Sequence, residues 1–443
     1  MTDSLNSRLV NRAIEPQCQF FVLRKKRLCR MTVKPGRQYC GEHEPQPETA
    51  DGQDDTRIPC PNDPKHTCYV SKLEKHLSVC NARFTQQPPY IVYNINSPAE
   101  VGSSPRLPLS QLSEQTVLNV IEKVNFLYDK HIKGHITTEP EHPIHSAVLK
   151  EFSECDRTES SLRHLRQVSS LLWLAEREGL VADNTCYVEL GAGKGHMSYY
   201  VCKAWMAAGA GRGALLVDRA ALRHKRDNKL RGAAERLRAD LAHLALGLVP
   251  AAQRALALVG LAKHLCGVAT GNPTTSYTIV TARSLSVGNY GVSIRREEGR
   301  GTLNVYIYTD YALRCITADG VLDKTRGIVL ATCCHHRCEH AAFIANKQLQ
   351  LGISGEELNV MLGIVSWATC GDGRSRSQRQ AGAERGDVGG GAERGEVGRR
   401  AKQLLDWARL LHLRERGFHA RLTYYVPTTV SLENVCIVAT KHS

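Results

Sequence analysis

A run of fifteen residues, YVELGAGKGHMSYYV, combines a glutamate, three alternating glycines and the start of a helical pattern. Gly191, Gly193 and Gly195 carry no Cβ atom, so the backbone can approach a ligand closely there. Their spacing differs from the Gly-x-Gly-x-x-Gly of dinucleotide-binding folds, and no Gly-Lys-Ser/Thr follows as in a P-loop. The run predicts a buried strand, a ligand-binding turn and a helix; a turn that only joins strand to helix is the alternative.

Acidic residues near this turn indicate which ligand it suits. Glu189 lies two residues before the first glycine, where it would repel a pyrophosphate but tolerate a cationic group. Asp218 ends the next apolar run, GALLVDR, and a carboxylate there can accept hydrogen bonds from ribose hydroxyls. Asp240, in ERLRADLAHL, is a candidate for a place near an adenine. S-adenosylmethionine has cationic ammonium and sulfonium groups, so we expect it as the cofactor.

Two further apolar runs end in groups that could take part in catalysis. ALALVGLAKHLCG contains Lys263 and His264, and GIVLATCCHHRCEH contains His335 among cysteines and a second histidine. Ligands of open α/β sheets bind beyond the carboxyl ends of the strands, so we expect both groups to face the glycine turn. A cation and titratable imidazoles are then available for catalysis. A third zinc site, or buried thiols without a chemical role, are the alternatives for the second run.

Four residues near the amino terminus have the types and spacing of a zinc site: Cys18, Cys29, Cys40 and His43. Three thiolates and an imidazole suit tetrahedral zinc, and the Cys-x-x-His step can present two ligands to one ion. A loop with incidental cysteines is the alternative. The segment RKKR, with two phenylalanines before it, could contact phosphates and stack on bases, or form a solvated face.

A second set of four potential ligands follows: Cys60, His66, His76 and Cys80. Helical spacing directs the last two to one side of a helix, and two thiolates with two imidazoles complete a structural zinc shell. So short a segment cannot bury enough apolar surface to fold alone, so the metal would supply the folding energy. The spacing resembles the small CHHC zinc fingers of RNA-associated proteins.

The composition sets the broad class. The chain has 443 residues, a formal net charge of +14 and sixteen cysteines. The length predicts two or three folded units, and the charge favours an acidic partner such as nucleic acid over a surface that is basic only for solubility. The chain begins with no apolar secretory signal and has no apolar run that could cross a bilayer. We therefore expect an intracellular protein, in the nucleus or the cytoplasm, that does not enter a membrane.

The periodicity predicts four parts. These are a CCCH-type knuckle, a CHHC-type finger, a Pro-rich linker and an α/β domain with a helical lead-in, over residues 14–45, 57–84, 85–110 and 111–443. Helices are expected over 109–132, 161–180 and 401–418, and a strand pair at the end. The basic run 218–238 is compatible with a helix that contacts RNA or only solvent. Residues 371–400 are low in complexity and predicted to be disordered.

Together these segments resemble the eukaryotic tRNA 2′-O-methyltransferases that modify nucleotide 4 of the acceptor stem. The resemblance rests on the two finger patterns, VELGAGKG, VDR, LAKHLCG, CCHHRC, SWATCG and YYVPTTVSLENVCIVAT, in the same order. It implies a Rossmann-like, S-adenosylmethionine-dependent methyltransferase domain, with zinc fingers that help to hold tRNA. A ribose 2′-hydroxyl would attack the sulfonium methyl group. We assign Lys263 to electrostatic stabilisation of the alkoxide and His264 to orientation or base catalysis. His335 is the reserve candidate.

Residues 271–309 have no counterpart in this pattern, and they follow the expected catalytic strand end directly. Our hypothesis is that a non-coding segment has been retained in the gene model, and a transcript that routinely carries it would refute this. Two other functions stay open. One is a zinc-finger RNA-binding protein with a degenerate methyltransferase fold. The other is a transferase that acts on a base nitrogen or a protein, because acceptor pockets vary among folds that share a cofactor site.

Overall fold

The computed structural model describes two compact units, residues 1–86 and 87–443. Within them it describes residues 17–22, 27–29, 31–33, 35–40, 43, 56–80, 82–83, 87–98, 107–206, 213–220, 222, 225–230, 232–263, 308–333, 335, 338, 343–345, 351–370 and 391–441. His264 and His336, and most of the predicted insertion 271–309, lie outside the described residues. In the part of the chain described, no helix has both the length and the apolar character needed to span a membrane.

The described residues of the first unit form two small β-hairpins and one α-helix. The first hairpin consists of β1 (Phe21–Val22) and β2 (Arg27–Leu28). The second consists of β3 (Arg57–Cys60) and β4 (Asp63–Tyr69), and the helix α1 (Leu73–Val79) follows it. Both strand pairs are antiparallel. Every buried hydrophobic side chain in the described part of this unit is a cysteine or Val33, so an apolar core contributes little to its stability.

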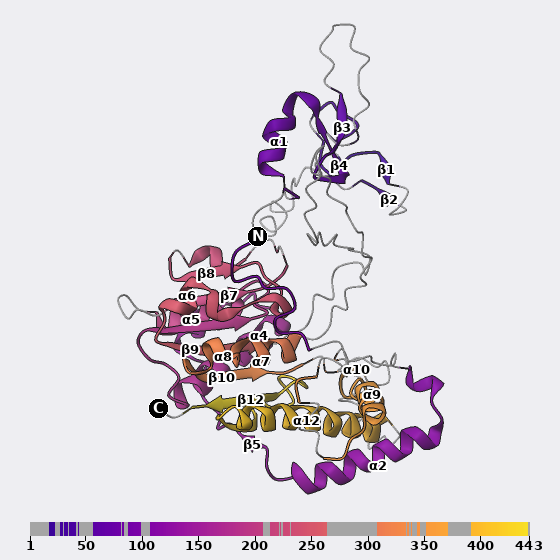
Figure 1. The fold of residues 1–443 in the computed structure, drawn as a ribbon, viewed down its shortest axis with the longest axis vertical. Coiled ribbons are helices and arrows are strands. Elements are labelled where there is room, and N and C mark those ends of the chain that lie inside the picture. Colours follow the sequence, from indigo (N-terminus) through magenta and orange to yellow (C-terminus); the bar gives the residue numbers. More distant parts are fainter. Residues whose placement is uncertain are drawn as a thin grey trace, which may run out of the picture. The chain divides into compact units, whose positions relative to one another are not determined.

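The second unit is built on an eight-stranded mixed sheet (Figure 1). Its strand order is β5-β11-β12-β10-β9-β6-β7-β8, and β12 alone runs antiparallel to its neighbours in this sheet. The strands are β5 (Thr137–Thr138), β6 (Thr185–Leu190), β7 (Gly213–Val217), β8 (Ala234–Leu237), β9 (Ala257–Lys263), β10 (Thr325–Ala331), β11 (His419–Tyr424) and β12 (Val435–Thr440). From β6 the chain builds outward through β7 and β8, then returns to β9 on the other side. The strand order therefore reverses at β6, which is where open α/β sheets bind ligands.

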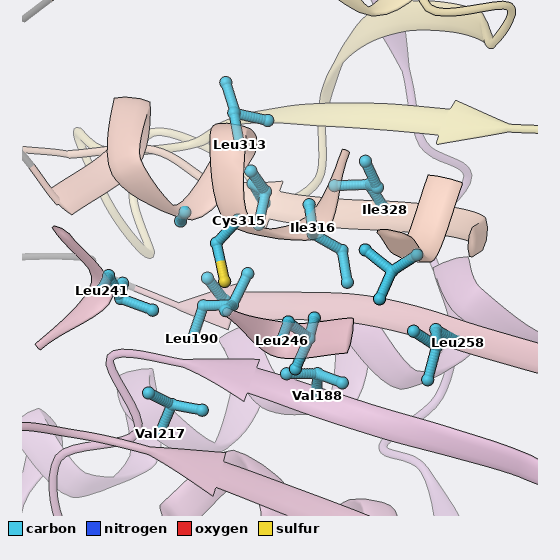
Figure 2. Close-up of a cluster of buried hydrophobic side chains, with 14 of the residues drawn as sticks. Val188, Leu190, Val217, Leu241, Leu246, Leu258, Leu313, Cys315, Ile316 and Ile328 are labelled. Carbon is cyan, nitrogen blue, oxygen red and sulfur yellow. The ribbon is translucent and has the colours of Figure 1, made fainter. Parts of the chain in front are cut away.

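Helices cover both faces of this sheet, because strands buried on both sides expose apolar side chains on each. One face packs on α3 (Ser146–Phe152), α4 (Glu159–Arg177) and α5 (His196–Trp205). The other packs on α6 (Pro250–Arg254), α7 (Tyr308–Ile316), α8 (Asp319–Leu322) and the end of α12 (Gly391–Glu415). Figure 2 shows Cys315 and Ile316 of α7 directed toward the side chains of the strands, including Val188 and Leu190 of β6, while Leu313 points to the opposite side of α7.

A further hydrophobic core, formed mainly between helices, lies beside the sheet. It joins α2 (Glu114–His131), α9 (Gly355–Ile364) and α12, and α10 (Trp367–Cys370) packs on the start of α12. Ser113 caps α2 by accepting a hydrogen bond from the backbone N–H of Thr116, and Ser354 and Glu357 form a capping box at α9. The helices predicted over 109–132, 161–180 and 401–418, and the closing strand pair, are confirmed.

Two predictions about low-complexity and basic segments were wrong in part. Residues 391–400, predicted to be disordered, form the first ten residues of α12. One glycine in this stretch serves close packing: a Cβ atom at Gly398 would lie 2.5 Å from the backbone nitrogen of Ala368. The basic run 218–238 is not a helix where it is described, since it forms a short 3₁₀ turn at Asp227–Lys229 and then β8.

A segment inside the predicted linker is part of the second unit and packs on the residues that follow β8. The buried Asn96 donates hydrogen bonds from Nδ2 to the carbonyl oxygens of Leu241 and Leu244, at 2.7 and 2.8 Å. The backbone of Val92 donates to the carbonyl oxygen of His243, and Tyr93 stacks on the ring of that histidine. Residues 87–98 therefore form a strap beside the carboxyl end of β8, next to Asp240.

Candidate active site and metal centres

The glycine turn follows β6 at the point where the strand order reverses. Gly191, Gly193 and Gly195 have φ angles of 72°, 52° and 72°, in the left-handed region that favours glycine. At Gly195 space is also limiting, because a Cβ atom would lie 2.8 Å from Leu216 and 2.9 Å from Asp227. The turn thus needs glycine for its backbone conformation at three positions and for close packing at one.

Backbone and side-chain contacts fix the shape of this turn. The carbonyl oxygen of Val217, the last residue of β7, accepts hydrogen bonds from the N–H groups of Gly191 and Ala192, each at 2.9 Å. Arg236 donates to the carbonyl oxygen of Gly193 at 3.0 Å, and the N–H of Arg226 donates to that of Lys194 at 2.8 Å. These contacts within the chain fix the conformation of the turn, which lowers the cost of ordering it on binding.

Asp218 contacts the turn from the neighbouring strand. Its Oδ2 atom accepts a hydrogen bond of 2.7 Å from the N–H of Gly193, and its Oδ1 atom accepts one from Ala220. An ionised carboxylate has about four lone-pair positions. One further position remains on each oxygen, so Asp218 can also accept bonds from two ribose hydroxyls.

Glu189 holds the other side of the turn. Its carboxylate accepts hydrogen bonds from the backbone N–H of Ser198, at 2.9 Å, and from the Ser198 hydroxyl, in the first turn of α5. Burial raises the pKa of Glu189 to about 7, against the hydrogen bonds, which lower it. Glu189 pairs across the sheet with Leu216, two residues before Asp218, so alternation places both carboxylates on the same face.

Asp240 lies one strand further out, after β8. Its Oδ1 atom accepts a hydrogen bond of 3.0 Å from the N–H of Ala242, and its Oδ2 atom lies 3.7 Å from a guanidinium nitrogen of Arg219. The side chain thus caps the 3₁₀ turn at Leu241–His243, to which the strap of residues 87–98 is bound. This leaves Asp240 near the expected adenine side of the turn but already engaged in local contacts.

Lys263 ends β9, the neighbour of β6 on the other side. Its Nζ atom lies 2.7 Å from Nδ1 of His164, on α4, and the ring of His164 meets that of His196 edge-on at 4.9 Å. Burial, followed by the charge of Arg226, lowers the pKa of His196 to about 4, so this imidazole is neutral at physiological pH. Sequence patterns gave no signal for either histidine, because their approach to Lys263 is set by the packing of α4 and α5.

An ion pair between Arg226 and Glu151 lies beside the glycine turn. Arg226 binds both carboxylate oxygens of Glu151, at the end of α3, and also contacts the hydroxyl of Tyr200 at 2.9 Å. Burial raises the pKa of Glu151, but the bonds from Arg226 and Tyr200 outweigh this effect and lower it to about 2. Since the backbone of Arg226 also binds the glycine turn, this pair fixes the turn relative to α3 and α5.

His335 lies in a different cluster, after β10. It is buried, and its Nε2 atom lies 2.8 Å from Asp406, which also accepts hydrogen bonds from Thr332 and Arg409. Burial raises the pKa of the nearby Cys338 thiol to about 12, and its sulfur atom lies 3.1 Å from a guanidinium nitrogen of Arg409. His335 therefore belongs to the buried hydrogen-bond network that joins Asp406 to Thr332 and Arg409. Cys334 and His336 lie outside the described residues, so the third zinc site stays a prediction.

The first finger gathers its four predicted ligands. Cys18, Cys29, Cys40 and His43 present their ligand atoms within 4.8 Å of one another. The Nδ1 atom of His43 lies 3.6 and 3.4 Å from the sulfur atoms of Cys18 and Cys40, and Phe20 stacks on its ring at 4.0 Å. Bonds of about 2.3 Å to sulfur and 2.0–2.1 Å to nitrogen separate the ligands of tetrahedral zinc by roughly 3.3–3.8 Å. These distances fit one zinc ion.

The second finger gathers its ligands as closely. Cys60, His66, His76 and Cys80 form the other group of potential metal ligands in the described residues. The two sulfur atoms are 3.7 Å apart, and the two Nε2 atoms 3.1 Å. The cross distances, His76 to Cys60 and His66 to Cys80, are 3.2 and 3.5 Å. All four pairs are close to the edges of a zinc tetrahedron.

Comparison with known protein families agrees with this geometry. The family model described as Methyltransferase TRM13 matches residues 166–285 and 307–440, which together are more than half of the chain. The chain belongs to the TRM13 methyltransferase family. The models for the CCCH zinc finger in TRM13 protein and for the U11-48K-like CHHC zinc finger match residues 16–44 and 57–81. The family resemblance, the α/β methyltransferase fold and the two zinc-finger clusters expected from the sequence are confirmed.

Curated relatives extend the similarity to almost the whole chain. Two proteins called tRNA:m(4)X modification enzyme TRM13 homolog, from Mus musculus and Homo sapiens, are each 33% identical over 96% of this chain and 94% of their own length. The tRNA:m(4)X modification enzyme TRM13 of Kluyveromyces lactis is 26% identical over 96% of this chain and 95% of its own length. The family match omits residues 286–306, inside the stretch 271–309 that lacks a counterpart in the sequence pattern.

Proposed function

We propose that this TRM13-family methyltransferase transfers a methyl group from S-adenosylmethionine to the 2′-hydroxyl of nucleotide 4 in the acceptor stem of tRNA. The names of its relatives support the choice of tRNA and of position 4. Because tRNA is present in the nucleus and the cytoplasm, we place the activity in one or both. The observation that carries the proposal is the preformed glycine turn between Glu189 and Asp218, one strand away from Lys263.

In this proposal each residue around the turn contacts a different part of the cofactor. Gly191, Gly193 and Gly195 admit it close to the backbone, and Asp218 accepts hydrogen bonds from its ribose. Glu189, when ionised, provides a negative charge near its ammonium and sulfonium groups. Asp240 borders the adenine, on the turn that the strap of residues 87–98 secures. Bound there, S-adenosylmethionine supplies an electrophilic methyl group on a sulfonium sulfur.

The acceptor needs help, because a ribose hydroxyl is a poor nucleophile at neutral pH. Its oxygen forms the new bond to the methyl carbon while the carbon–sulfur bond breaks and its electron pair stays on sulfur. We propose that the ammonium of Lys263 stabilises the negative charge that develops on this oxygen, with His164 holding Nζ in place. His264 stays a candidate for taking the proton. His335, in its buried cluster, is the reserve candidate.

The fingers bind zinc and contribute to holding tRNA in this proposal. Their proposed ligands are the two groups Cys18, Cys29, Cys40 and His43, and Cys60, His66, His76 and Cys80. Phe20 and Phe21 are 42% and 49% exposed, which is unusual for phenylalanine and leaves their rings able to stack on bases. The net charge of +14 supports contact with the tRNA backbone.

Methyl transfer to tRNA from radiolabelled S-adenosylmethionine tests the proposal, with calorimetry of cofactor binding alongside. Asp218→Ala should abolish both, whereas Asp156→Ala, in an exposed turn before α4, should change neither. A zinc-replete, folded wild-type protein that binds no cofactor would favour an RNA-binding protein with a degenerate methyltransferase fold. Transfer to a base nitrogen would keep the enzyme and refute the proposed acceptor.

A further inference from the structure

A cavity of about 670 Å³ opens at the carboxyl edge of the sheet, outside the cofactor turn. It is lined by the ends of β10 and β11, the start of β12, and parts of α4 and α12. Known ligand pockets occupy roughly 300–1,000 Å³, so this cavity has room for a small molecule or one nucleobase. None of the glycines or carboxylates assigned to the cofactor lines it.

Two independent observations place the cavity next to Lys263. Thr332, which lines it, directly follows Ala331, and Ala331 pairs with Lys263 across β9 and β10. Ser169 and Ser170 also line it, on the same helix as His164, which contacts Lys263. A group in the cavity is therefore on the opposite side of Lys263 from the glycine turn.

The charges of the lining disfavour a phosphate. In the part of the chain that the structure describes, five carboxylates and three basic side chains of lysine or arginine line the cavity. All three of these cations are already paired, Lys402 with Glu433, Arg399 with Glu396 and Arg166 with Glu159. An anionic ligand would have to compete with these carboxylates for a cation, whereas a neutral group with N–H donors would find oxygen acceptors.

The remaining lining suits a flat, polar ring. Gln403 and Asn434 are each 7% exposed, and one hydrogen bond orients each amide: Gln403 donates to the hydroxyl of Tyr424 at 2.9 Å, and Asn434 to the carbonyl oxygen of Val426 at 3.1 Å. An amide offers up to four hydrogen bonds, and amide side chains are common readers of base edges. Tyr128 and Tyr424 add apolar ring surface to the lining.

We propose that this cavity binds the base of the nucleotide whose ribose is methylated, after that base has left the acceptor-stem duplex. The inference rests on the proposed function. A duplex cannot enter the cavity, but a single base can, and enzymes that modify nucleotides within duplexes extrude them in this way. With its base between β10 and α12, the ribose lies toward Lys263 and the methyl donor. The carboxylate and amide oxygens of the lining can accept hydrogen bonds, which favours bases that carry an exocyclic amino group.

The fluorescence of 2-aminopurine, which rises when the base unstacks, tests the proposal directly. We would place 2-aminopurine at position 4 of a full-length tRNA and titrate it with the zinc-replete wild-type protein. The proposal predicts a severalfold rise in fluorescence that saturates with tRNA binding. Methyl transfer to this tRNA without any rise would overturn it.

A cavity-filling variant provides the second arm. Ser170 is half-buried and lines the cavity, so Ser170→Phe should block the base while leaving the cofactor turn intact. We expect unchanged cofactor affinity, loss of the fluorescence rise and a fall of at least tenfold in the single-turnover rate. Ser160→Phe, on the exposed side of the same helix, is the matched control. Equal rates for the two variants would contradict the cavity proposal, whereas a wild-type protein that transfers no methyl to tRNA would contradict the proposed function.

Discussion

The Nζ atom of Lys263 lies 2.7 Å from Nδ1 of His164, although 99 residues separate them in the chain. The contact joins the end of β9 to the first half of α4, and it fixes the ammonium at the edge of the sheet where the cofactor turn lies. A lysine side chain otherwise has considerable rotamer freedom, so this contact lowers the entropy that must be lost when Lys263 meets an acceptor.

Replacing Lys263 should therefore slow chemistry more than binding. We expect Lys263→Ala to lower the single-turnover rate of methyl transfer by about a hundredfold or more, the usual effect of removing one such electrostatic contact. Cofactor affinity should change by less than about threefold, because the turn keeps its other contacts. Rapid-quench kinetics and calorimetry measure the two quantities. A variant that loses cofactor affinity but keeps its rate would exclude this role.

The partner histidine can be tested through its acceptor atom. His164→Asn keeps an acceptor near the position of Nδ1, whereas His164→Leu removes it. We expect the rate of His164→Asn to lie between those of the wild type and His164→Leu, because positioning of Lys263 is partly restored. If both variants transfer methyl groups at the wild-type rate, the contact has no part in catalysis.

The raised pKa of Glu189 predicts a pH dependence of cofactor binding. With a pKa of about 7, the carboxyl is mostly neutral at pH 6 and mostly ionised at pH 8. Only the ionised form attracts the cationic groups of S-adenosylmethionine, so affinity should rise with pH through this range. Glu189→Gln should remove the rise. Calorimetry at pH 6, 7 and 8 checks both proteins, and a flat profile for the wild type would show that Glu189 is ionised throughout or does not face the cofactor.

The same shift has a consequence for stability. A carboxyl whose pKa is higher in the folded than in the unfolded protein favours folding at low pH, and this contribution is lost as the pH rises through the folded value. Near and above pH 7 the Glu189→Gln variant should therefore have a higher free energy of unfolding than the wild type, because the substitution removes a buried charge. Thermal unfolding at pH 5.5 and 8 measures the difference, and the gain should be larger at pH 8.

Removal of zinc should act on one unit only. The described part of the finger unit has almost no apolar core beyond its cysteines, so its folding depends on metal. We expect chelation to weaken tRNA binding at least tenfold and to leave cofactor affinity unchanged, because the methyltransferase unit is separate. Loss of cofactor binding on chelation would contradict this independence.

Two cysteines provide a matched pair for the same question. Cys80 belongs to the second ligand group, whereas Cys68 is buried nearby but outside it. Metal analysis should find two zinc ions per chain in the wild type and in Cys68→Ala, but one in Cys80→Ala. Two ions in Cys80→Ala would mean that the group does not hold zinc as proposed.

Two glycines of α12 should respond to alanine with opposite signs. A Cβ atom at Gly398 would meet the backbone of Ala368 at 2.5 Å, so Gly398→Ala should destabilise the protein by about 1–3 kcal/mol. At Gly395 the nearest atom would be 3.6 Å away, on the flexible Arg399 side chain, so Gly395→Ala should stabilise it by up to about 1 kcal/mol. Thermal unfolding distinguishes the two, and stabilisation by both would refute the close contact with α10.

Local patterns were sufficient to predict several of the strands, the glycine turn and the grouping of the finger residues. An apolar run that stops at glycines marks β6, and the spacing of Cys60, His66, His76 and Cys80 suits one ion. These features depend on residues close together in the sequence. The fold class could be predicted because strands followed by polar or titratable side chains are expected to end at the same edge of one α/β sheet.

Features that depend on long-range packing were not predictable. His164 and His196 carry no motif, and Arg226 and Arg236 belong to a basic run that resembles a solvated helix but clamps the glycine turn instead. The start of α12 has the composition of a disordered segment, yet its Gly398 permits contact with α10. In each case the partner lies far away in the sequence, and only the assembled fold determines the outcome.

Mapping the methyl group on tRNA tests the central claim most directly. A 2′-O-methyl group removes the nucleophile that alkali needs to cleave the adjacent phosphodiester, so a modified position survives alkaline hydrolysis as a dinucleotide. After incubation of tRNA with the purified zinc-replete protein and labelled S-adenosylmethionine, we predict a single alkali-resistant, labelled dinucleotide that begins at position 4. Label that appears only in mononucleotides would place the methyl group on a base and contradict the account.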